Sequence, residues 1–230
     1  MESPRHHIES AVIAPGLLSN PFAHRLARRL RESDIPRLEL SPAAYRSLSR
    51  VEDPQGIAVV VRQRWERLTR VGPDAGLCWV VLDTVRSPGN LGTVIRTIDA
   101  VGAAGVILIG DPIDPYAPEV VRATMGAVFA VRFVRTTEAE FDRWRVRQGV
   151  TLVGTSPHAT DDYCSVRYPA RLALWMGGER RGLSDEAQAS CDRVVRIPMV
   201  GKSDSLNLAM ATSVLLYEVF NQQRCGASRD

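Results

Sequence analysis

The sequence predicts an α/β protein: a parallel β-sheet with helices on both faces over residues 71–230, preceded by a small αβ domain over residues 1–70. Three observations predict this arrangement. Continuous apolar runs alternate with helical stretches in the longer part, as they do in parallel sheets whose faces are both covered. Strands and helices follow one another in shorter steps in the first third. Between the two parts, residues 63–76 contain Val71-Gly72-Pro73-Asp74 and are typical of a linker.

In the first third, residues 8–13 predict a strand. Ser19 or Asn20 then caps a helix that has Pro21 at its first position and extends to about residue 33. Its inward side chains are expected to be Phe22, Leu26, Ala27 and Leu30. A short strand at 37–40 and a helix opened by Ser41-Pro42 follow. The β-branched run at 57–61 predicts a buried strand.

The longer part repeats a strand–helix pattern. Apolar runs predict strands at residues 77–82, 105–109, 132–134, 150–154, 172–176 and 194–197. Helical stretches alternate with them at residues 91–101, 118–125, 138–148, 184–190 and 206–222. Parallel sheets bind their ligands at the carboxyl ends of the strands, so the loops that leave these ends are where a site is expected.

The charge is unevenly distributed along the chain. Of 230 residues, 29 are Lys or Arg and 26 are Asp or Glu, and Lys202 is the only lysine. Residues 1–70 hold 12 Arg against 8 acidic residues, whereas the remainder is close to neutral. A basic amino-terminal module beside a neutral body fits a protein that binds a polyanion, although an ordinary solvated surface explains the same numbers.

Composition also excludes several classes of protein. With 45% hydrophobic and 24% charged residues, the chain is neither disordered, collagen-like nor a coiled coil. No apolar run is long enough for a membrane span and no signal peptide is recognisable, so no membrane partner and a cytoplasmic location are expected. The cysteines lie far apart without histidines at ligand spacing, which argues against a metal site and against a disulfide scaffold: Cys78, Cys164, Cys191 and Cys225.

Three loops carry the informative residues. The first, residues 83–92, leads into a helix that carries Arg96, and Asn90 either caps this helix or projects from the loop. A glycine-containing helix start with a nearby arginine suits a phosphate, while a capping Asn with an Arg in a surface ion pair is the plainer interpretation.

The second loop, residues 175–184, has three glycines that allow a ligand to approach the backbone closely. It matches neither a dinucleotide fingerprint nor a P-loop, and Glu179 would repel a triphosphate, so an adenosine derivative fits better. The third loop, residues 197–207, enters the last helix, for which Ser205 is the expected cap, with Asn207 in the first turn.

Together the loops read N-x-G-x-x-x-R-T, M-G-G-E-x-x-G-L-S and I-P-M-x-G-x-x-x-S-L-N, in this order within the strand–helix pattern. The chain resembles the SpoU (TrmH-type) branch of the SPOUT methyltransferases over residues 77–222. This resemblance implies methylation of ribose 2′-hydroxyls in ribosomal or transfer RNA with S-adenosyl-L-methionine. It also implies a carboxyl-terminal trefoil knot and a homodimer.

The resemblance assigns roles residue by residue. Arg96 matches the catalytic arginine, placed near the 2′-hydroxyl and an RNA phosphate. Since a guanidinium gives up its proton too reluctantly to act as a base, we expect Arg96 to be a phosphate clamp and electrostatic activator instead. The other catalytic and RNA-facing positions are Asn90, Glu179, Ser205 and Asn207. The cofactor positions are Thr155, Ser156, Leu174, Gly177, Gly178, Ile197, Met199 and Leu206, with the adenine among Leu174, Ile197 and Leu206. Gly178 stands where the family often has Asn.

Residues 8–62 resemble the small substrate-binding domain that is often fused to these enzymes. The helix that usually precedes its first strand is missing, so this domain is expected to be incomplete at its amino end, either naturally or by clipping. Its expected RNA-binding side chains are Arg25, Arg28 and Arg29, for which a solvated helix face is the alternative.

The predicted function is therefore S-adenosyl-L-methionine-dependent 2′-O-methylation of ribosomal RNA. A transfer RNA methyltransferase is the alternative within the same class. A non-catalytic RNA-binding or ribosome-assembly protein on the same fold is the alternative from another class, and the intact motif residues argue against it. A dinucleotide-dependent dehydrogenase ranks third, because the glycine spacing is wrong.

Overall fold

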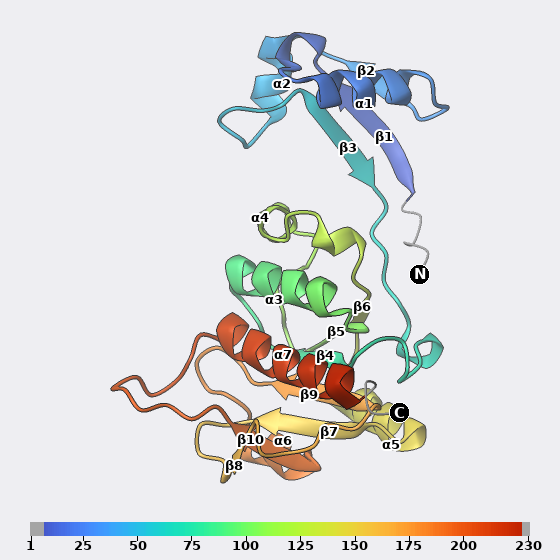
Figure 1. Ribbon diagram of the computed structural model, residues 1–230. Coiled ribbons are helices and arrows are strands. Elements are labelled where there is room, and N and C mark those ends of the chain that lie inside the picture. The colour runs from blue at the N-terminus through green and yellow to red at the C-terminus, as the bar shows by residue number, and fades with distance from the viewer. Residues whose placement is uncertain (1–6, 227–230) are drawn as a thin grey trace. The chain divides into compact units, whose positions relative to one another are not determined.

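The computed structural model describes residues 7–226 and divides into two compact units after Arg64 (Figure 1). The division falls a few residues before the boundary expected near residue 70, because the start of the linker packs with the larger unit. The Trp65 ring meets the Tyr116 ring edge-on at 5.7 Å, and the Glu66 N–H donates to the Phe133 carbonyl at 2.8 Å. The short 3-10 turn η2 (Leu68–Arg70) follows within the larger unit.

The first unit is a three-stranded sheet of order β2-β1-β3. Strand β2 (Arg37–Glu39) runs parallel and β3 (Ile57–Val61) antiparallel to the central β1 (Ile8–Ile13). Helix α1 (Pro21–Arg31) buries Ala27 and Leu30 against Ala11 and Ile13 of β1. The turn η1 (Pro15–Leu17) and helix α2 (Pro42–Leu48), which Ser41 caps as predicted, complete the unit.

Two sequence expectations for this unit are wrong. Phe22 was placed on the inward face of α1 but is 66% exposed, because Asn20 caps the helix and this register turns Ala23 inward instead. The strand at 57–61 was expected to be buried, yet Val59 and Val60 are exposed. This strand forms an edge of a sheet with only three members, which leaves it few neighbours to cover it.

The structure confirms the predicted parallel sheet, which forms the centre of the second unit. Its order is β6-β5-β4-β9-β7-β10-β8, and every neighbouring pair is parallel. The bounds are β4 (Trp79–Asp83), β5 (Gly105–Ile109), β6 (Phe133–Arg135), β7 (Thr151–Thr155), β8 (Asp161–Asp162), β9 (Leu172–Met176) and β10 (Arg193–Arg196). The sequence missed β8, whose two residues are too short for any periodicity.

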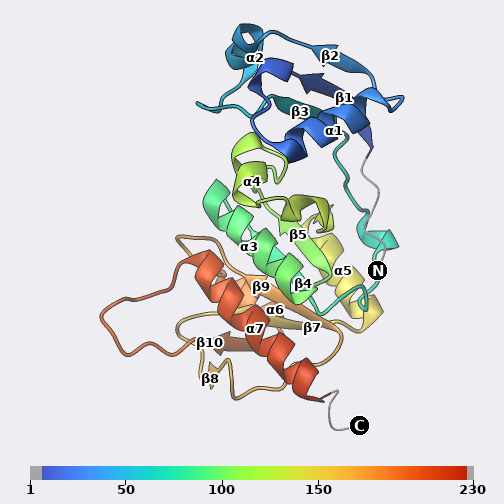
Figure 2. The same cartoon turned by 45° about the horizontal axis from the view of Figure 1, so that its top comes forward.

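Helices cover both faces of this sheet, as expected (Figure 2). One face carries α3 (Pro88–Val101), α4 (Pro118–Ala123) with the turn η3 (Ala127–Phe129), and α7 (Leu208–Gly226). The other face carries α5 (Glu138–Gln148) and α6 (Asp185–Ser190). Alternate residues of β4 serve the two cores, since Val80 and Leu82 face α3 while Trp79 and Val81 face α5.

The strand order brings loops that are distant in sequence together. Strand β9 lies between β4 and β7, so its carboxyl end emerges beside the loop that follows β4. Strand β10 lies on the other side of β7. The three motif loops follow β4, β9 and β10, and they therefore leave the same edge of the sheet. Within residues 7–226, no helix is long and apolar enough to cross a membrane.

Candidate functional site

The amino ends of α3 and α7 fix the positions of two asparagines. Ser87 caps α3, with its Oγ accepting the Asn90 N–H at 3.3 Å, so Asn90 lies in the first helical turn rather than capping the helix. Asn207 caps α7, since its Oδ1 accepts the Ala209 N–H at 2.9 Å. The expectation that Ser205 caps this helix is wrong. Helix α7 begins at Leu208, and Ser205 stands exposed in the preceding loop.

A hydrogen-bonded chain of three side chains joins the three motif loops. The Asn207 Nδ2 donates to the Asn90 Oδ1 at 2.9 Å, and the Asn90 Nδ2 donates to the Glu179 Oε1 at 2.6 Å. The same Glu179 oxygen accepts the Ser87 N–H at 3.3 Å. Because the Asn207 Oδ1 is occupied by main-chain N–H groups of α7, the orientation of both amides follows from the network.

Glycines allow the loop after β9 to fold back on itself. Gly178 and Gly182 exchange two backbone hydrogen bonds, at 3.1 and 2.9 Å. A Cβ atom on Gly177 would lie 2.1 Å from the Gly182 carbonyl carbon, so no larger residue fits there without moving the backbone. Gly182 has a φ of +65°, in the left-handed region that favours glycine. The hairpin holds Glu179 at its turn, beside the first turn of α3.

A cavity of about 510 Å³ opens at the carboxyl ends of β7, β9 and β10. Most of the side chains and glycines expected from the sequence line it: Thr155, Ser156, Gly177, Gly178, Glu179, Ile197, Met199, Ser205 and Leu206. Its volume lies within the range of small-molecule sites. Among the residues that the structure describes, no group of three or more His, Cys, Asp or Glu side chains could hold a metal ion.

Leu174 does not line this cavity, contrary to the sequence expectation. It lies in the middle of β9 and is completely buried in the core beneath α3 and α7. Met176, two residues or about 7 Å further along the strand, reaches the cavity in its place. Sequence periodicity identifies the strand but does not show how close to its end the cavity begins.

The sequence does not single out several of the residues that line the cavity. The motif loop after β9 contributes Arg180, Arg181 and Leu183. Their place in the same loop as Glu179 could have identified them as lining residues. His158 also lines the cavity, although the motifs do not require it. Asp185 and Gln188 come from α6, where nothing in the sequence distinguishes them from other surface residues.

Arg96 lies outside the cavity lining, on the exposed side of α3. It follows Asn90 by six residues, which corresponds to about 9 Å along the helix axis. Its guanidinium makes no hydrogen bond or ion pair with any residue between 7 and 226. An exposed guanidinium without a partner among residues 7–226 is available to an anion.

In the first unit, α1 brings the predicted arginines Arg25, Arg28 and Arg29 onto its exposed side. These three make no ion pair within the described part of the chain. Arg31 differs from them, because its Nε donates to the Glu39 Oε1 at 2.7 Å. The helix thus holds three exposed, uncompensated positive charges.

Comparisons with known proteins agree with this geometry. A model of the SpoU rRNA Methylase family matches residues 78–217. The 23S rRNA (uridine(2479)-2′-O)-methyltransferase of Streptomyces viridochromogenes is 34% identical over 89% of this chain and 73% of its own. The 23S rRNA (guanosine(2553)-2′-O)-methyltransferase RlmP of Bacillus subtilis is 29% identical over 93% of this chain and 85% of its own. The AdoMet-bound rRNA methyltransferase of Sinorhizobium meliloti has a TM-score of 0.84 and 37% identity, covering 94% of this chain and 80% of that one.

Proposed function

Since the chain belongs to the SpoU rRNA Methylase family, we propose that it methylates a ribose 2′-hydroxyl of ribosomal RNA with S-adenosyl-L-methionine as the methyl donor. The observation that carries this proposal is the junction of the three motif loops, where Asn207, Asn90 and Glu179 are hydrogen-bonded to one another beside the cavity. The junction puts polar side chains from three strand ends at the place where a methyl acceptor would meet the donor.

The residues of the cavity fit this donor. Ile197, Leu206 and Leu183 offer apolar surface to a flat adenine ring, and the Gly177–Gly178 backbone permits close approach. Thr155, Ser156 and His158 supply hydrogen-bonding groups on the β7 side. When bound, S-adenosyl-L-methionine would supply the methyl group of its sulfonium for in-line displacement by the ribose oxygen, with a neutral thioether as the leaving group and the hydroxyl proton released to solvent.

The chain's own residues position the acceptor. Arg96 holds an RNA phosphate next to the target ribose, because its guanidinium is a planar fork of donors that is exposed without a partner among residues 7–226. Asn90, which accepts a hydrogen bond from Asn207, donates to the Glu179 Oε1, and Ser205 lines the same cavity. These groups orient the hydroxyl for attack.

Ribosomal RNA is favoured over transfer RNA by the extent of the matches. The relatives from Streptomyces and Bacillus match 89% and 93% of this chain, which includes both units, and both are named for positions in 23S rRNA. A non-catalytic RNA-binding or assembly role is disfavoured, because it would require neither the ordered amide network nor a free Arg96. Action on ribosomal RNA supports a cytoplasmic location.

We also propose the family's trefoil knot, homodimer and domain division for this chain. The insertion of β9 between β4 and β7, with both later motif loops lining one cavity, supports a knotted carboxyl-terminal segment. An apolar stripe on α7, formed by the exposed Met210 and Tyr217 with the half-buried Val214 between them, supports a second copy of the chain as its cover. The unit that ends at Arg64, with the three unpaired arginines of α1, serves as the RNA-binding domain.

The test combines a binding and a transfer measurement. Purified protein is incubated with tritiated S-adenosyl-L-methionine and unmodified 23S rRNA, 16S rRNA or transfer RNA, and the labelled position is mapped by primer extension. We expect label at a single ribose of ribosomal RNA. Arg96→Ala should lower transfer by at least about 100-fold, because the phosphate clamp is lost, while calorimetric affinity for the donor changes by less than about 3-fold. Loss of donor binding in this variant would contradict the role of Arg96.

A further inference from the structure

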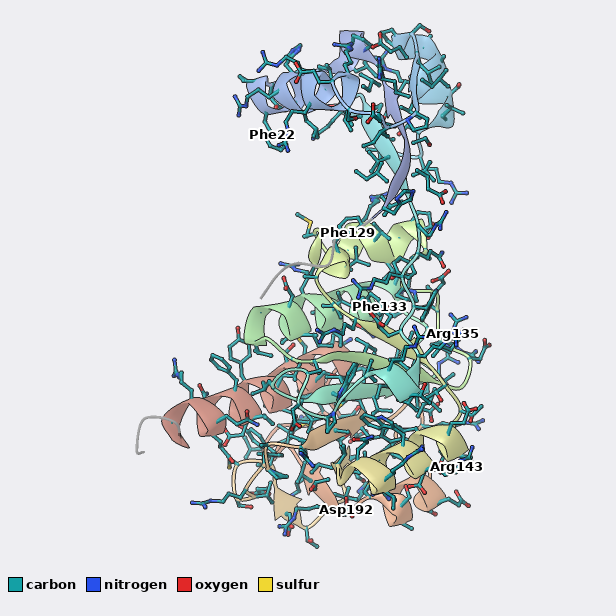
Figure 3. All side chains as sticks on the ribbon, turned by 90° about the vertical axis from the view of Figure 1, so that its right-hand side faces the viewer. Phe22, Phe129, Phe133, Arg135, Arg143 and Asp192 are labelled. Carbon is teal, nitrogen blue, oxygen red and sulfur yellow. The ribbon has the colours of Figure 1, made fainter. Side chains whose placement is uncertain are left out.

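Phe22 is an exposed aromatic side chain for which the first unit offers no cover. It occupies the second position of α1, after Pro21, and stands out from the first turn of that helix (Figure 3). Its side chain is 66% exposed, whereas Ala23, Ala27 and Leu30 form the buried side of α1. Core packing therefore does not account for a phenylalanine here, and a smaller or polar residue would serve the fold equally well.

Arginines lie on the same flank of the helix. Arg25 and Arg29 follow Phe22 by three and seven residues, a spacing that aligns the three side chains along one side of α1. Neither arginine makes an ion pair with a residue between 7 and 226, and the first turn of α1 contains no acidic residue. On the other flank, Arg31 is neutralised by Glu39 at 2.7 Å. Two of the three uncompensated charges of α1, Arg25 and Arg29, thus lie on the same flank as the exposed ring.

We propose that Phe22, Arg25 and Arg29 form a contact surface for unpaired RNA, with one base stacked on the Phe22 ring and neighbouring phosphates held by the two arginines. An aromatic face beside phosphate-binding cations is the combination that single-stranded nucleic acid requires. This inference rests on the proposed function, because it presumes an RNA substrate, and it adds the form of RNA that the first unit recognises.

The partner is an unpaired segment rather than a duplex for a geometric reason. In an A-form helix the bases are stacked on one another, so their faces are closed to a protein side chain. A duplex could use the arginines but not the ring. An apolar protein partner could use the ring, but it would leave two arginines uncompensated, whereas RNA satisfies both at once.

The experiment measures binding of the full chain to two fluorescein-labelled probes, a 15-nucleotide oligouridylate and a 15-base-pair RNA duplex, by fluorescence anisotropy between 50 and 200 mM KCl. The variants are Phe22→Ala, Phe22→Trp and Arg29→Gln. Arg31→Gln is the matched control, since this arginine lies on the same helix but is already paired. Because Phe22 is exposed, its replacement should leave the melting temperature unchanged.

We expect Phe22→Ala to weaken binding of the oligouridylate by about 5- to 100-fold without changing the salt dependence. Phe22→Trp should retain the affinity, and duplex binding should respond to neither change. Arg29→Gln should weaken both probes and reduce the slope of log K against log salt for the single strand by about 0.7. Arg31→Gln should change neither probe.

Other outcomes overturn the inference. If Phe22→Ala binds the oligouridylate with unchanged affinity, no base stacks on the Phe22 ring. If the affinity for both probes falls equally, the ring is a general apolar contact and not a stacking surface for a base. If the wild-type chain binds neither probe, yet methylates ribosomal RNA, the surface is not an RNA surface while the proposed function stands. If methyl transfer and donor binding are absent but the oligouridylate binds as expected, the proposed function fails and the surface remains.

Discussion

The side chains of Glu179 and Arg96 differ in how firmly their surroundings fix their orientation. Glu179 is held through its Oε1 by Asn90 at 2.6 Å and by the Ser87 N–H at 3.3 Å, so its carboxylate has one orientation. The Arg96 side chain has no hydrogen-bond or ion-pair partner between residues 7 and 226, so we expect a ligand to set its orientation. We interpret the first as a preorganised group and the second as a group that binding orders, which is consistent with a phosphate clamp.

The four cysteines allow a prediction at the same scale. Burial raises the pKa of the Cys78 thiol to about 12 and that of Cys191 to about 11, whereas Cys164 and Cys225 are exposed. A raised pKa keeps the first two thiols protonated at pH 8, and the thiolate is the reactive form. Iodoacetamide at pH 8 should therefore label Cys164 and Cys225 at least about tenfold faster, as measured by peptide mass spectrometry. Denaturation should equalise the four rates, and rapid labelling of native Cys78 would contradict its burial.

Among the elements, α3 and α7 fix the positions of the side chains proposed to be catalytic. They lie side by side, with the Thr97 and Ser213 hydroxyl oxygens 2.9 Å apart, and each begins with a cap that also belongs to the site. The start of each helix is thereby tied to the position of a functional side chain. A shift of either helix by one residue would break the chain from Asn207 to Glu179, so the packing of α3 on α7 maintains the site.

The two tasks of Asn207 can be separated by substitution. Asn207→Ala removes the cap and should lower the free energy of unfolding by about 1 kcal/mol. Asn207→Asp retains an oxygen that accepts the Ala209 N–H but cannot donate to the Asn90 Oδ1. This variant should therefore keep the stability of the native protein while its turnover falls at least about tenfold. Thermal unfolding and the methyl-transfer rate are the two measurements, and full turnover in Asn207→Asp would mean that the amide chain does not support catalysis.

At the scale of the whole molecule, the exposed apolar side chains of α7 allow a prediction of the oligomeric state. Met210 and Tyr217 are 57% and 48% exposed on α7, on the side turned away from the sheet. Large apolar side chains in a row on one helix are typical of a surface that another chain covers. This stripe adjoins the start of α7, where the cap of the site lies, so a second copy bound there would approach the cavity mouth.

We expect the protein to sediment at about twice its monomer mass and Met210→Glu to shift it to the monomer, because a buried, unpaired carboxylate opposes association. Met125→Glu is the matched control. Met125 is 79% exposed in the loop after α4 and does not belong to the α7 stripe, so this variant should remain dimeric. Analytical ultracentrifugation measures the mass of both variants. A dimer that persists in Met210→Glu would show that α7 is not part of the interface.

Local patterns in the sequence predict the parallel sheet, its covering helices and the motif loops, because apolar periodicity, caps and glycines act over a few neighbouring residues. The strand at 172–176 and the cap of α2 at Ser41 follow from such local rules. Tertiary contacts were needed to show that Phe22 faces outward, that Asn207 rather than Ser205 caps α7, and that Met176 replaces Leu174 at the cavity. They alone joined Asn207 to Glu179 through Asn90. These outcomes depend on contacts between segments that are distant in the sequence. Strand β9 lies between β4 and β7 in the sheet, and the pattern of residues within a single segment does not specify its neighbours.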